Sequence, residues 1–345
     1  MSRRTARDEP DFWQYARDFL HDYCPKTRHM SATTIRTYHI GLEAFISYLT
    51  DNGTKRQDIT FDAFNKTSVK DYSTWMSQTK GYAPRTIDLR LTVLKSFLKY
   101  AAWQDASLMA LHNGLHLVKP PKASKQPIEH LSPQATTAIL AAWGTDTPKA
   151  RRNRALLILL YDSAARVSEI TNTTLGDLHL GTPPFITLTG KGTKTRHMPL
   201  MDKTTQHLRA YLEEFHNNPI SRTNPSTPLF YSLKHGQPAA LSTDTISTIL
   251  TQAATRARPT CPQIPDRVHP HLLRKTRAMD LYTDGIPLPL IMQMLGHESM
   301  TTTSTFYAFA TMQMMTDAIA GANPQAIGEA PTWRQPAIID ALYHL

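Results

Sequence analysis

The segment from Val118 to His130 constrains the architecture of this chain more than any other stretch of its 345 residues. It holds three prolines and three lysines and very few apolar side chains. Such a stretch cannot contribute to a packed core and is typical of an extended linker. The chain also exceeds the ~100–200 residues usual for one domain. We therefore predict domains at residues 1–117 and 131–322, a linker at 118–130 and a tail at 323–345.

The residues before the linker have helical periodicity. Between residues 35 and 49 apolar side chains recur three or four positions apart, and Ser31 is a suitable N-cap. A second such pattern begins at Pro84 and runs to Ala101, and weaker patterns cover residues 12–23 and 68–77. We predict an all-helical bundle of four helices for this domain.

Positive charge is concentrated in the same part of the chain. The net charge is +10, and residues 1–125 carry 19 basic and 12 acidic side chains, most of the surplus. A surplus of this kind suits a polyanionic partner, although it can equally serve solubility. Arg85, Arg90, Lys95 and Lys99 lie on or beside the polar side of the helix that begins at Pro84. They are candidate DNA contacts, and the alternative is an ordinary solvated face.

Several classes of protein and site are disfavoured by the sequence. Cys24 and Cys261 are far apart and lack a Cys-x-x-Cys partner, so neither a disulfide framework nor a cysteine zinc site is expected. No His-x-x-x-His pair or Cys/His cluster has the carboxylate support that would indicate a metal site. The longest apolar run, residues 155–161, is far below the ~20 residues of a membrane span, and the first residues lack the apolar run that is typical of a signal peptide. We expect a cytosolic protein without a cofactor.

The part after the linker mixes helices with a hairpin. Helices are expected from Ser132-Pro133 and over residues 154–164, 204–216, 242–257, 270–283 and 287–295. Residues 185–189 and 195–200 are predicted strands around a Gly-Lys-Gly-Thr turn, which places Lys191 at a hairpin tip. The predicted fold class is mainly α with a small antiparallel β-sheet.

Six side chains in this part suit phosphate chemistry. In order they are Arg166, Lys191, His271, Arg274, His297 and Tyr307. Forked guanidinium groups bind the non-bridging oxygens of a phosphate in pairs, while a nucleophile attacks in line. His271 and Arg274 are three apart on an expected helix, so they leave one face and can reach one phosphate.

Each of these residues also has an ordinary explanation. Arg166 could form an intrahelical ion pair with Glu169, and Lys191 could merely belong to a glycine turn. His271 or His297 alone would usually be a structural histidine. The order and the intervals of the whole set favour strand transfer on DNA.

Four motifs carry a resemblance to a known family. They are Arg166-Val167-Ser168-Glu169, Gly190-Lys191-Gly192-Thr193-Lys194, His271-Leu272-Leu273-Arg274 and Leu295-Gly296-His297, with Tyr307 after paired threonines. Together they resemble the tyrosine recombinase, or phage integrase, family over residues 131–320. The resemblance implies a two-domain, C-shaped clamp on double-stranded DNA, with a helical core-binding domain and an α+β catalytic domain.

The resemblance also implies a role for each residue. Arg166 and Arg274 would clamp the scissile phosphate, and Tyr307 would attack it to form a 3′-phosphotyrosine. Lys191 would protonate the leaving 5′-oxygen, and His271 would assist proton transfer at the tyrosine. His297 would hydrogen-bond the phosphate. A second 5′-hydroxyl would then reverse the attack without ATP or metal.

The sequence departs from the family pattern in three places. Ser163-Ala164-Ala165 replaces a glycine-containing turn, and we expect this turn to remain functional. Lys275 stands where many members have a second histidine, and with Lys194 it is a candidate DNA contact. The commonest spacing would put the nucleophile at Phe306, which has no hydroxyl, so Tyr307 is predicted. Tyr161 and Tyr282 are expected to be core residues.

The expected partners follow from the same resemblance. They are DNA recombination sites, three further copies of this chain in a synaptic tetramer, and accessory proteins that bend DNA or set the direction of the reaction. The protein is expected to be associated with the nucleoid. The apolar end of the tail is expected to dock on a neighbouring protomer, or alternatively on its own domain. Integration, excision, transposition and dimer resolution stay open. The alternatives are a type IB topoisomerase-like enzyme and a catalytically silent DNA-binding protein.

Overall fold

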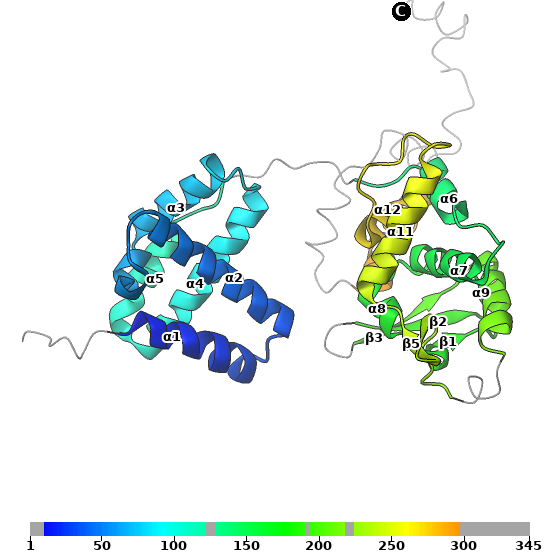
Figure 1. Cartoon of the computed structure of the whole chain (residues 1–345), viewed down its shortest axis with the longest axis horizontal. Helices are drawn as coiled ribbons and strands as arrows, with labels where there is room; N and C mark the ends of the chain where they lie inside the picture. The colour runs from blue at the N-terminus through cyan, green and yellow to red at the C-terminus, as the bar shows by residue number, and fades with distance from the viewer. Residues whose placement is uncertain (1–9, 122–128, 191–193, 218–223, 297–345) are drawn as a thin grey trace, which may run out of the picture. The chain divides into compact units, whose positions relative to one another are not determined.

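The computed structural model describes residues 10–121, 129–190, 194–217 and 224–296 (Figure 1). The chain divides into two compact units, Met1–Gln126 and Pro127–Leu345. The fold is mainly helical with small antiparallel sheets, as the sequence predicts. Among the described helices, none combines the length and the apolar character required to span a membrane.

The N-terminal unit is a helical bundle. Its α-helices are α1 (Phe12–Asp18), α2 (Ala32–Asp51), α3 (Lys66–Gln78), α4 (Pro84–Gln104) and α5 (Met109–His116). A π-helical segment, Phe19–Thr27, continues α1. Ser31 caps α2 by accepting a hydrogen bond from the Thr34 amide, as its position predicts.

The prediction of four helices was wrong by one. Helix α5 has eight residues and follows a short 3-10 turn, without a capping side chain at its start. Leu115 is its one fully buried side chain among the described residues. A helix this short shows too few apolar positions for a periodicity to be recognised, so its stability comes from packing on α3 and α4.

Aromatic side chains fill the core of the N-terminal unit. Phe12, Phe64 and Phe97 are almost fully buried. The ring centroids of Phe12 and Phe97 are 5.8 Å apart at 88°, the edge-to-face geometry that aromatic pairs favour. This unit therefore has a hydrophobic core of its own and does not need the C-terminal unit to bury its apolar faces.

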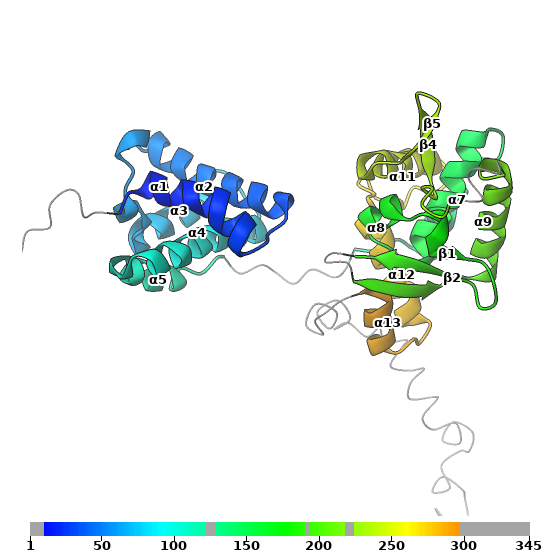
Figure 2. The same cartoon turned by 90° about the horizontal axis from the view of Figure 1, so that it is seen from below.

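The C-terminal unit packs helices on a small sheet (Figures 1 and 2). Its helices are α6 (Pro133–Ala141), α7 (Pro148–Asp162), α8 (Val167–Asn172), α9 (Asp202–Phe215), α11 (Thr243–Ala257), α12 (Pro270–Thr283) and α13 (Leu288–Leu295). Ser132 and Ser242 cap α6 and α11 through their hydroxyl oxygens. The core is continuous from α6 through the sheet to α12.

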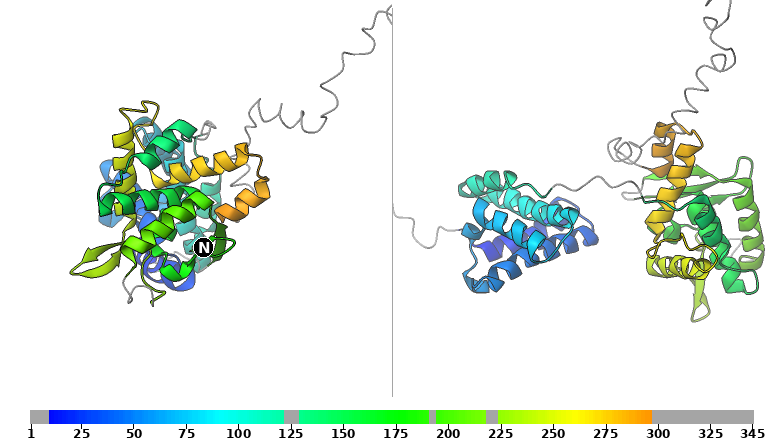
Figure 3. Two further views of the ribbon diagram at one scale, coloured as in Figure 1. Left: turned by 90° about the vertical axis from the view of Figure 1, so that its right-hand side faces the viewer. Right: turned by 90° about the horizontal axis from the view of Figure 1, so that it is seen from above.

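Two antiparallel sheets occur among the described residues of this unit. Strands β1 (Leu178–His179), β2 (Phe185–Thr189) and β3 (Thr195–Pro199) form one in the order β1-β2-β3. Strands β4 (Tyr231–Lys234) and β5 (Gln237–Ala240) form a separate hairpin. Figures 2 and 3 show this hairpin on the side of the unit remote from α13. The sequence predicts β2 and β3, whereas β1, β4 and β5 were missed.

The segment around Arg166 differs from its prediction. Helix α7 begins at Pro148, six residues earlier than expected, and ends at Asp162 instead of residue 164. Arg166 is therefore not at the end of α7 but is the N-cap residue of the short helix α8. Thr147 and Pro148 supply the start signals of α7, a capping hydroxyl and a first-turn proline.

Candidate active site

A single buried carboxylate organises the candidate site. Glu169, in the first turn of α8, is 2% exposed. Its Oε2 accepts the backbone N–H of Arg166 at 2.7 Å, and its Oε1 accepts an N–H of the Arg166 guanidinium at 2.8 Å. This holds Arg166 at the start of α8, with its side chain 42% exposed to solvent.

Arg274 reaches the same place from another element. It lies on α12, is 3% exposed, and has a guanidinium nitrogen 4.0 Å from Glu169 Oε2. One of its N–H groups donates to the Ala164 carbonyl at 2.6 Å, and another donates to the Leu295 carbonyl at the end of α13. The structure thus brings together the two predicted arginines, which are 108 residues apart in sequence.

A third arginine, which the sequence reasoning did not single out, completes this cluster. Arg196 on β3 donates two N–H groups to the two Glu169 oxygens, each at 2.8 Å. Its Nε donates to the Met294 carbonyl at 2.8 Å. We call Glu169 with Arg166, Arg196 and Arg274 the arginine cluster.

The arginine cluster carries excess positive charge. Burial by itself would raise the pKa of Glu169, but bonds from Arg196 and Arg166 outweigh burial and lower the pKa to about 2. Glu169 is therefore ionised at neutral pH. One negative charge against three guanidinium groups leaves a formal surplus of +2, which suits an anionic ligand such as a phosphodiester.

His271 lies next to the cluster on α12. Although His271 is exposed, desolvation by the surrounding protein atoms is the largest cause that lowers its pKa, followed by the positive charges of Lys275, Arg274, His269 and Arg166. Its ring stacks at 6.5 Å on that of His269, which caps α12 by accepting the Leu272 amide. A histidine with a lowered pKa is neutral near pH 7 and can accept a proton.

The turn before Arg166 uses an unusual backbone conformation. Ala164 has φ +45°, a left-handed conformation that costs a residue with a Cβ about 1–2 kcal/mol. This turn directs the Ala164 carbonyl towards Arg274. The expectation that the segment functions without glycine is compatible with this geometry, although the backbone is more strained there than we expected from the sequence.

The three other predicted catalytic residues are not among the residues that the structure describes. They are Lys191, His297 and Tyr307. The ends of their motifs are described: Gly190 and Lys194 close the hairpin through a 2.8 Å backbone bond. A Cβ on Gly190 would lie 3.3 Å from Glu169 Oε1, so the hairpin base packs against the arginine cluster.

Tyr161 and Tyr282, expected to be core residues, are partly buried. The Tyr161 hydroxyl donates to Asp280 at 2.6 Å. Burial, followed by this bond, raises the pKa of Tyr161. Tyr282 packs beside the small apolar cluster at α12 and α13. The engaged hydroxyl and raised pKa of Tyr161 make it a poor nucleophile.

The candidate DNA contacts on α4 differ from one another. Arg85 is exposed. Arg90 donates to the Ile40 carbonyl at 3.1 Å and lies over the Tyr82 ring, and Lys95 donates to the Val118 carbonyl at 2.9 Å. The side chains of Arg90 and Lys95 therefore form hydrogen bonds within the N-terminal unit. In the C-terminal unit, Lys194 is exposed and Lys275 is partly buried.

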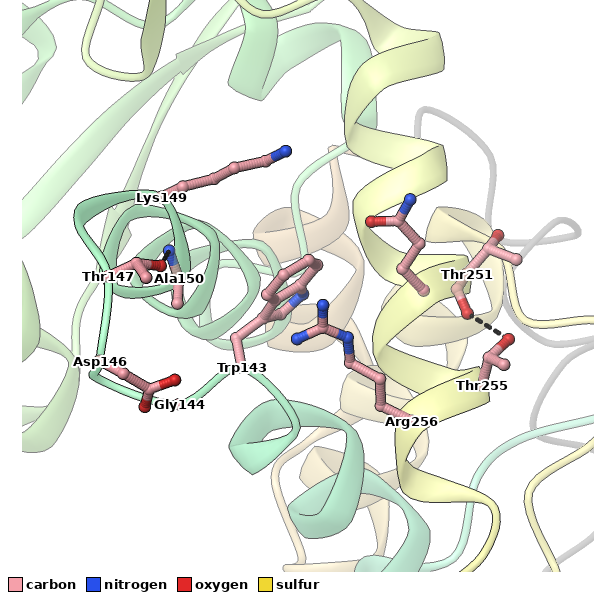
Figure 4. A pocket seen from close by; sticks show the side chains of 10 residues that line it. Trp143, Gly144, Asp146, Thr147, Lys149, Ala150, Thr251, Thr255 and Arg256 are labelled. Atoms are coloured by element: carbon pink, nitrogen blue, oxygen red, sulfur yellow. Dashed lines mark hydrogen bonds between the residues drawn. The ribbon is translucent and has the colours of Figure 1, made fainter.

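Two other features of the described residues lie apart from the arginine cluster. A groove of about 600 Å³ between α11 and the loop after α6 contains Arg256 stacked 3.9 Å from the centroid of Trp143 (Figure 4). His112 and His116 on α5 have Nε2 atoms 3.1 Å apart. No group of three or more metal-ligating side chains occurs among the residues that the structure describes.

Two family models match most of the chain. The phage integrase family model matches residues 129–314, and the phage integrase SAM-like domain model matches residues 11–108. The first match contains the whole arginine cluster and the three predicted residues that are not described. The second contains helices α1 to α4.

Curated relatives extend over nearly the same length. A tyrosine recombinase XerC of Bacillus pumilus is 27% identical over 83% of this chain and 88% of its own. A tyrosine recombinase XerD of Oceanobacillus iheyensis is 28% identical over 90% of this chain and 98% of its own.

A solved structure has the same fold. It is that of the XerH site-specific recombinase bound to a palindromic difH substrate, in a post-cleavage complex. It matches with a TM-score of 0.66 and 19% identity over 87% of this chain and 83% of its own. The chain therefore belongs to the phage integrase family of tyrosine recombinases, site-specific recombinases that cleave and rejoin DNA.

Proposed function

We propose that Arg166, Lys191, His271, Arg274, His297 and Tyr307 form the active site of this recombinase. Tyr307 attacks a DNA phosphodiester, a bond forms from its oxygen to phosphorus, and the bond to the 5′-oxygen breaks. The product is a 3′-phosphotyrosine and a free 5′-hydroxyl. Attack by a second 5′-hydroxyl reverses these steps on a new strand and releases the tyrosine.

The observation that carries this proposal is the convergence of Arg166 and Arg274 beside Glu169. Arg274 is held by two backbone carbonyls, so its orientation is set before DNA binds. Preorganised donors stabilise developing charge without reorganising during the reaction. The surplus positive charge of the arginine cluster offsets the extra negative charge on the phosphorus oxygens.

Two further residues transfer protons, and a third binds the phosphate. His271, with its lowered pKa, accepts the proton of the attacking tyrosine. Lys191 gives a proton to the leaving 5′-oxygen, and the packing of Gly190 against Glu169 brings its hairpin towards the cluster. His297 hydrogen-bonds a phosphate oxygen and follows Gly296, whose φ of +60° ends α13 in a left-handed turn.

At the level of assembly, we propose that residues 1–117 and 131–322 close as a C-shaped clamp on duplex DNA through the linker 118–130. Four copies would synapse two recombination sites, with the tail 323–345 docked on a neighbouring protomer. The XerH relative was solved on its difH substrate, which supports a recombination site as the ligand. Arg85 and Lys194, both exposed, are the proposed backbone contacts.

The test is formation of a covalent adduct on a nicked suicide substrate. Wild-type protein should form a protein–DNA species that resists denaturation, and Tyr307→Phe should form none while binding the same DNA. Tyr282→Phe is the matched control, because it removes a hydroxyl from the same unit without touching the proposed nucleophile. An adduct that persists in Tyr307→Phe would reject this assignment.

A further inference from the structure

Arg196 connects three elements that each adjoin a residue of the proposed site: β3 follows Lys191, α8 follows Arg166, and α13 precedes His297. It lies on β3 of the hairpin, and its side chain is 12% exposed. Its two terminal nitrogens bind both oxygens of Glu169 on α8, and its Nε binds the Met294 carbonyl near the end of α13. Bidentate guanidinium–carboxylate pairs fix orientation as well as charge.

The end of α13 connects Arg196 to Arg274. The Met294 carbonyl accepts from Arg196, and the next carbonyl, that of Leu295, accepts from Arg274. Gly296 then approaches Arg196 so closely that an added Cβ would lie 3.2 Å from a guanidinium nitrogen. Buried Arg274 and largely buried Arg196 therefore bind adjacent carbonyls of one helix terminus, where partial negative charge favours cations.

Arg166 depends on the same carboxylate. Its guanidinium binds one oxygen of Glu169, Oε1, which also accepts from Arg196, while Oε2 accepts from Arg196 and from the Arg166 backbone N–H. Its second terminal nitrogen makes a long contact of 3.4 Å to the Gly296 carbonyl. With 42% of its side chain exposed, Arg166 remains directed towards solvent, where a DNA phosphate can reach it.

We propose that Arg196 is a positioning residue for the recombination reaction, one that keeps Arg166 turned outward by satisfying Glu169 bidentately. Without Arg196, the buried Glu169 would lack two hydrogen bonds. Such an under-satisfied carboxylate attracts the nearest guanidinium strongly. Arg166 would turn inward to form a bidentate pair and withdraw from the scissile phosphate.

This inference rests on the proposed role of Arg166 as a phosphate clamp. Its test compares single-turnover cleavage at saturating protein on two nicked substrates, one with a normal scissile phosphodiester and one with a methylphosphonate. The methyl group replaces a charged non-bridging oxygen, so the substrate has less need of a cationic clamp. The same bonds form and break in both substrates.

Arg196→Ala should cleave the phosphodiester on the order of 100-fold more slowly, the penalty typical of a small misplacement of a catalytic group. On the methylphosphonate, the cleavage rate of Arg196→Ala should fall by less than about 5-fold. Arg166→Ala should likewise lose much more rate on the phosphodiester than on the methylphosphonate. The ratio of the two rates cancels any inactive fraction, so partial misfolding cannot produce this pattern. If Arg196→Ala lowers the cleavage rate by the same factor on both substrates, the positioning role is overturned.

The design separates the inference from the proposed function. If Arg166→Ala lowers the cleavage rate equally on both substrates, the clamp role of Arg166 fails. If Arg166→Ala slows cleavage of the phosphodiester more than that of the methylphosphonate and Arg196→Ala does not, only the inference about Arg196 fails. Arg196→Lys should be intermediate, because one ammonium keeps the charge but cannot reproduce the fork. Arg151→Ala removes a bidentate pair with Glu214 on the surface of the same unit and should leave the rate ratio unchanged.

Discussion

Replacing Glu169 with glutamine should destabilise the C-terminal unit strongly. The side chain keeps its shape but loses the charge that three arginines share. The gap between a pKa of about 2 in the folded protein and the usual 4.5 corresponds to about 3 kcal/mol. Removing one partner from a buried charge cluster typically costs about 3–5 kcal/mol, a range consistent with this value.

The stabilisation contributed by Glu169 should decrease as the pH falls. Because folding depresses the pKa of Glu169, its contribution is fully present above the ordinary pKa of 4.5 and is lost as pH falls towards 2. At pH 3.5 the wild-type advantage over Glu169→Gln should be smaller than at pH 7 by about 1.4 kcal/mol.

The assay is urea unfolding of the full chain between pH 7 and 3.5, with the transition of the C-terminal unit identified by hydrogen exchange of α7. Glu214→Gln is the matched control, since Glu214 pairs with Arg151 at the surface and should matter far less. A Glu169→Gln loss below about 1 kcal/mol, or one independent of pH over this range, would refute the role of the shared carboxylate.

Four further predictions follow from the site. Arg274→Ala should slow cleavage by more than about 100-fold while changing DNA affinity far less, and equal losses would indicate a binding role alone. At subsaturating DNA, cleavage should depend on deprotonation of a group with a pKa below 6.5, and His271→Ala should abolish that dependence. In thermal unfolding, the free energy of unfolding of Ala164→Gly should be within about 1 kcal/mol of wild type, because relief of the left-handed strain offsets the lost methyl burial and the added entropy of the unfolded chain. Ala165→Gly, which relieves no such strain, should lower the free energy of unfolding by about 1.5–2 kcal/mol. DNA affinity should fall steeply with added salt, and a flat response would contradict phosphate contacts by the basic N-terminal unit.

The long periodic helices could be predicted from the sequence. The helix from Pro84 has apolar residues at regular spacing and a first-turn proline, so its start is placed correctly. Helix α8 has six residues, too few to show a period, and its stability depends on Glu169 and the surrounding core. The strand β1 has two residues and was missed for the same reason.

The candidate site could be predicted only in part. Arg166 and Arg274 belong to motifs whose residues are close in sequence. The partners of Arg196 are 27 and 98 positions away, and no local pattern links them. The basic residue six positions after Gly190 was the available signal, but one charged side chain on a strand is usually a solvated residue.

The most direct test of the central claim is to identify the residue that carries the DNA. Protein trapped on a nicked suicide substrate would be digested, and the peptide bearing the nucleotide adduct sequenced by mass spectrometry. The adduct should be on Tyr307, through its phenolic oxygen and a 3′-phosphate. An adduct on Tyr161, Tyr282 or any other side chain, or on a 5′-phosphate, would contradict the account.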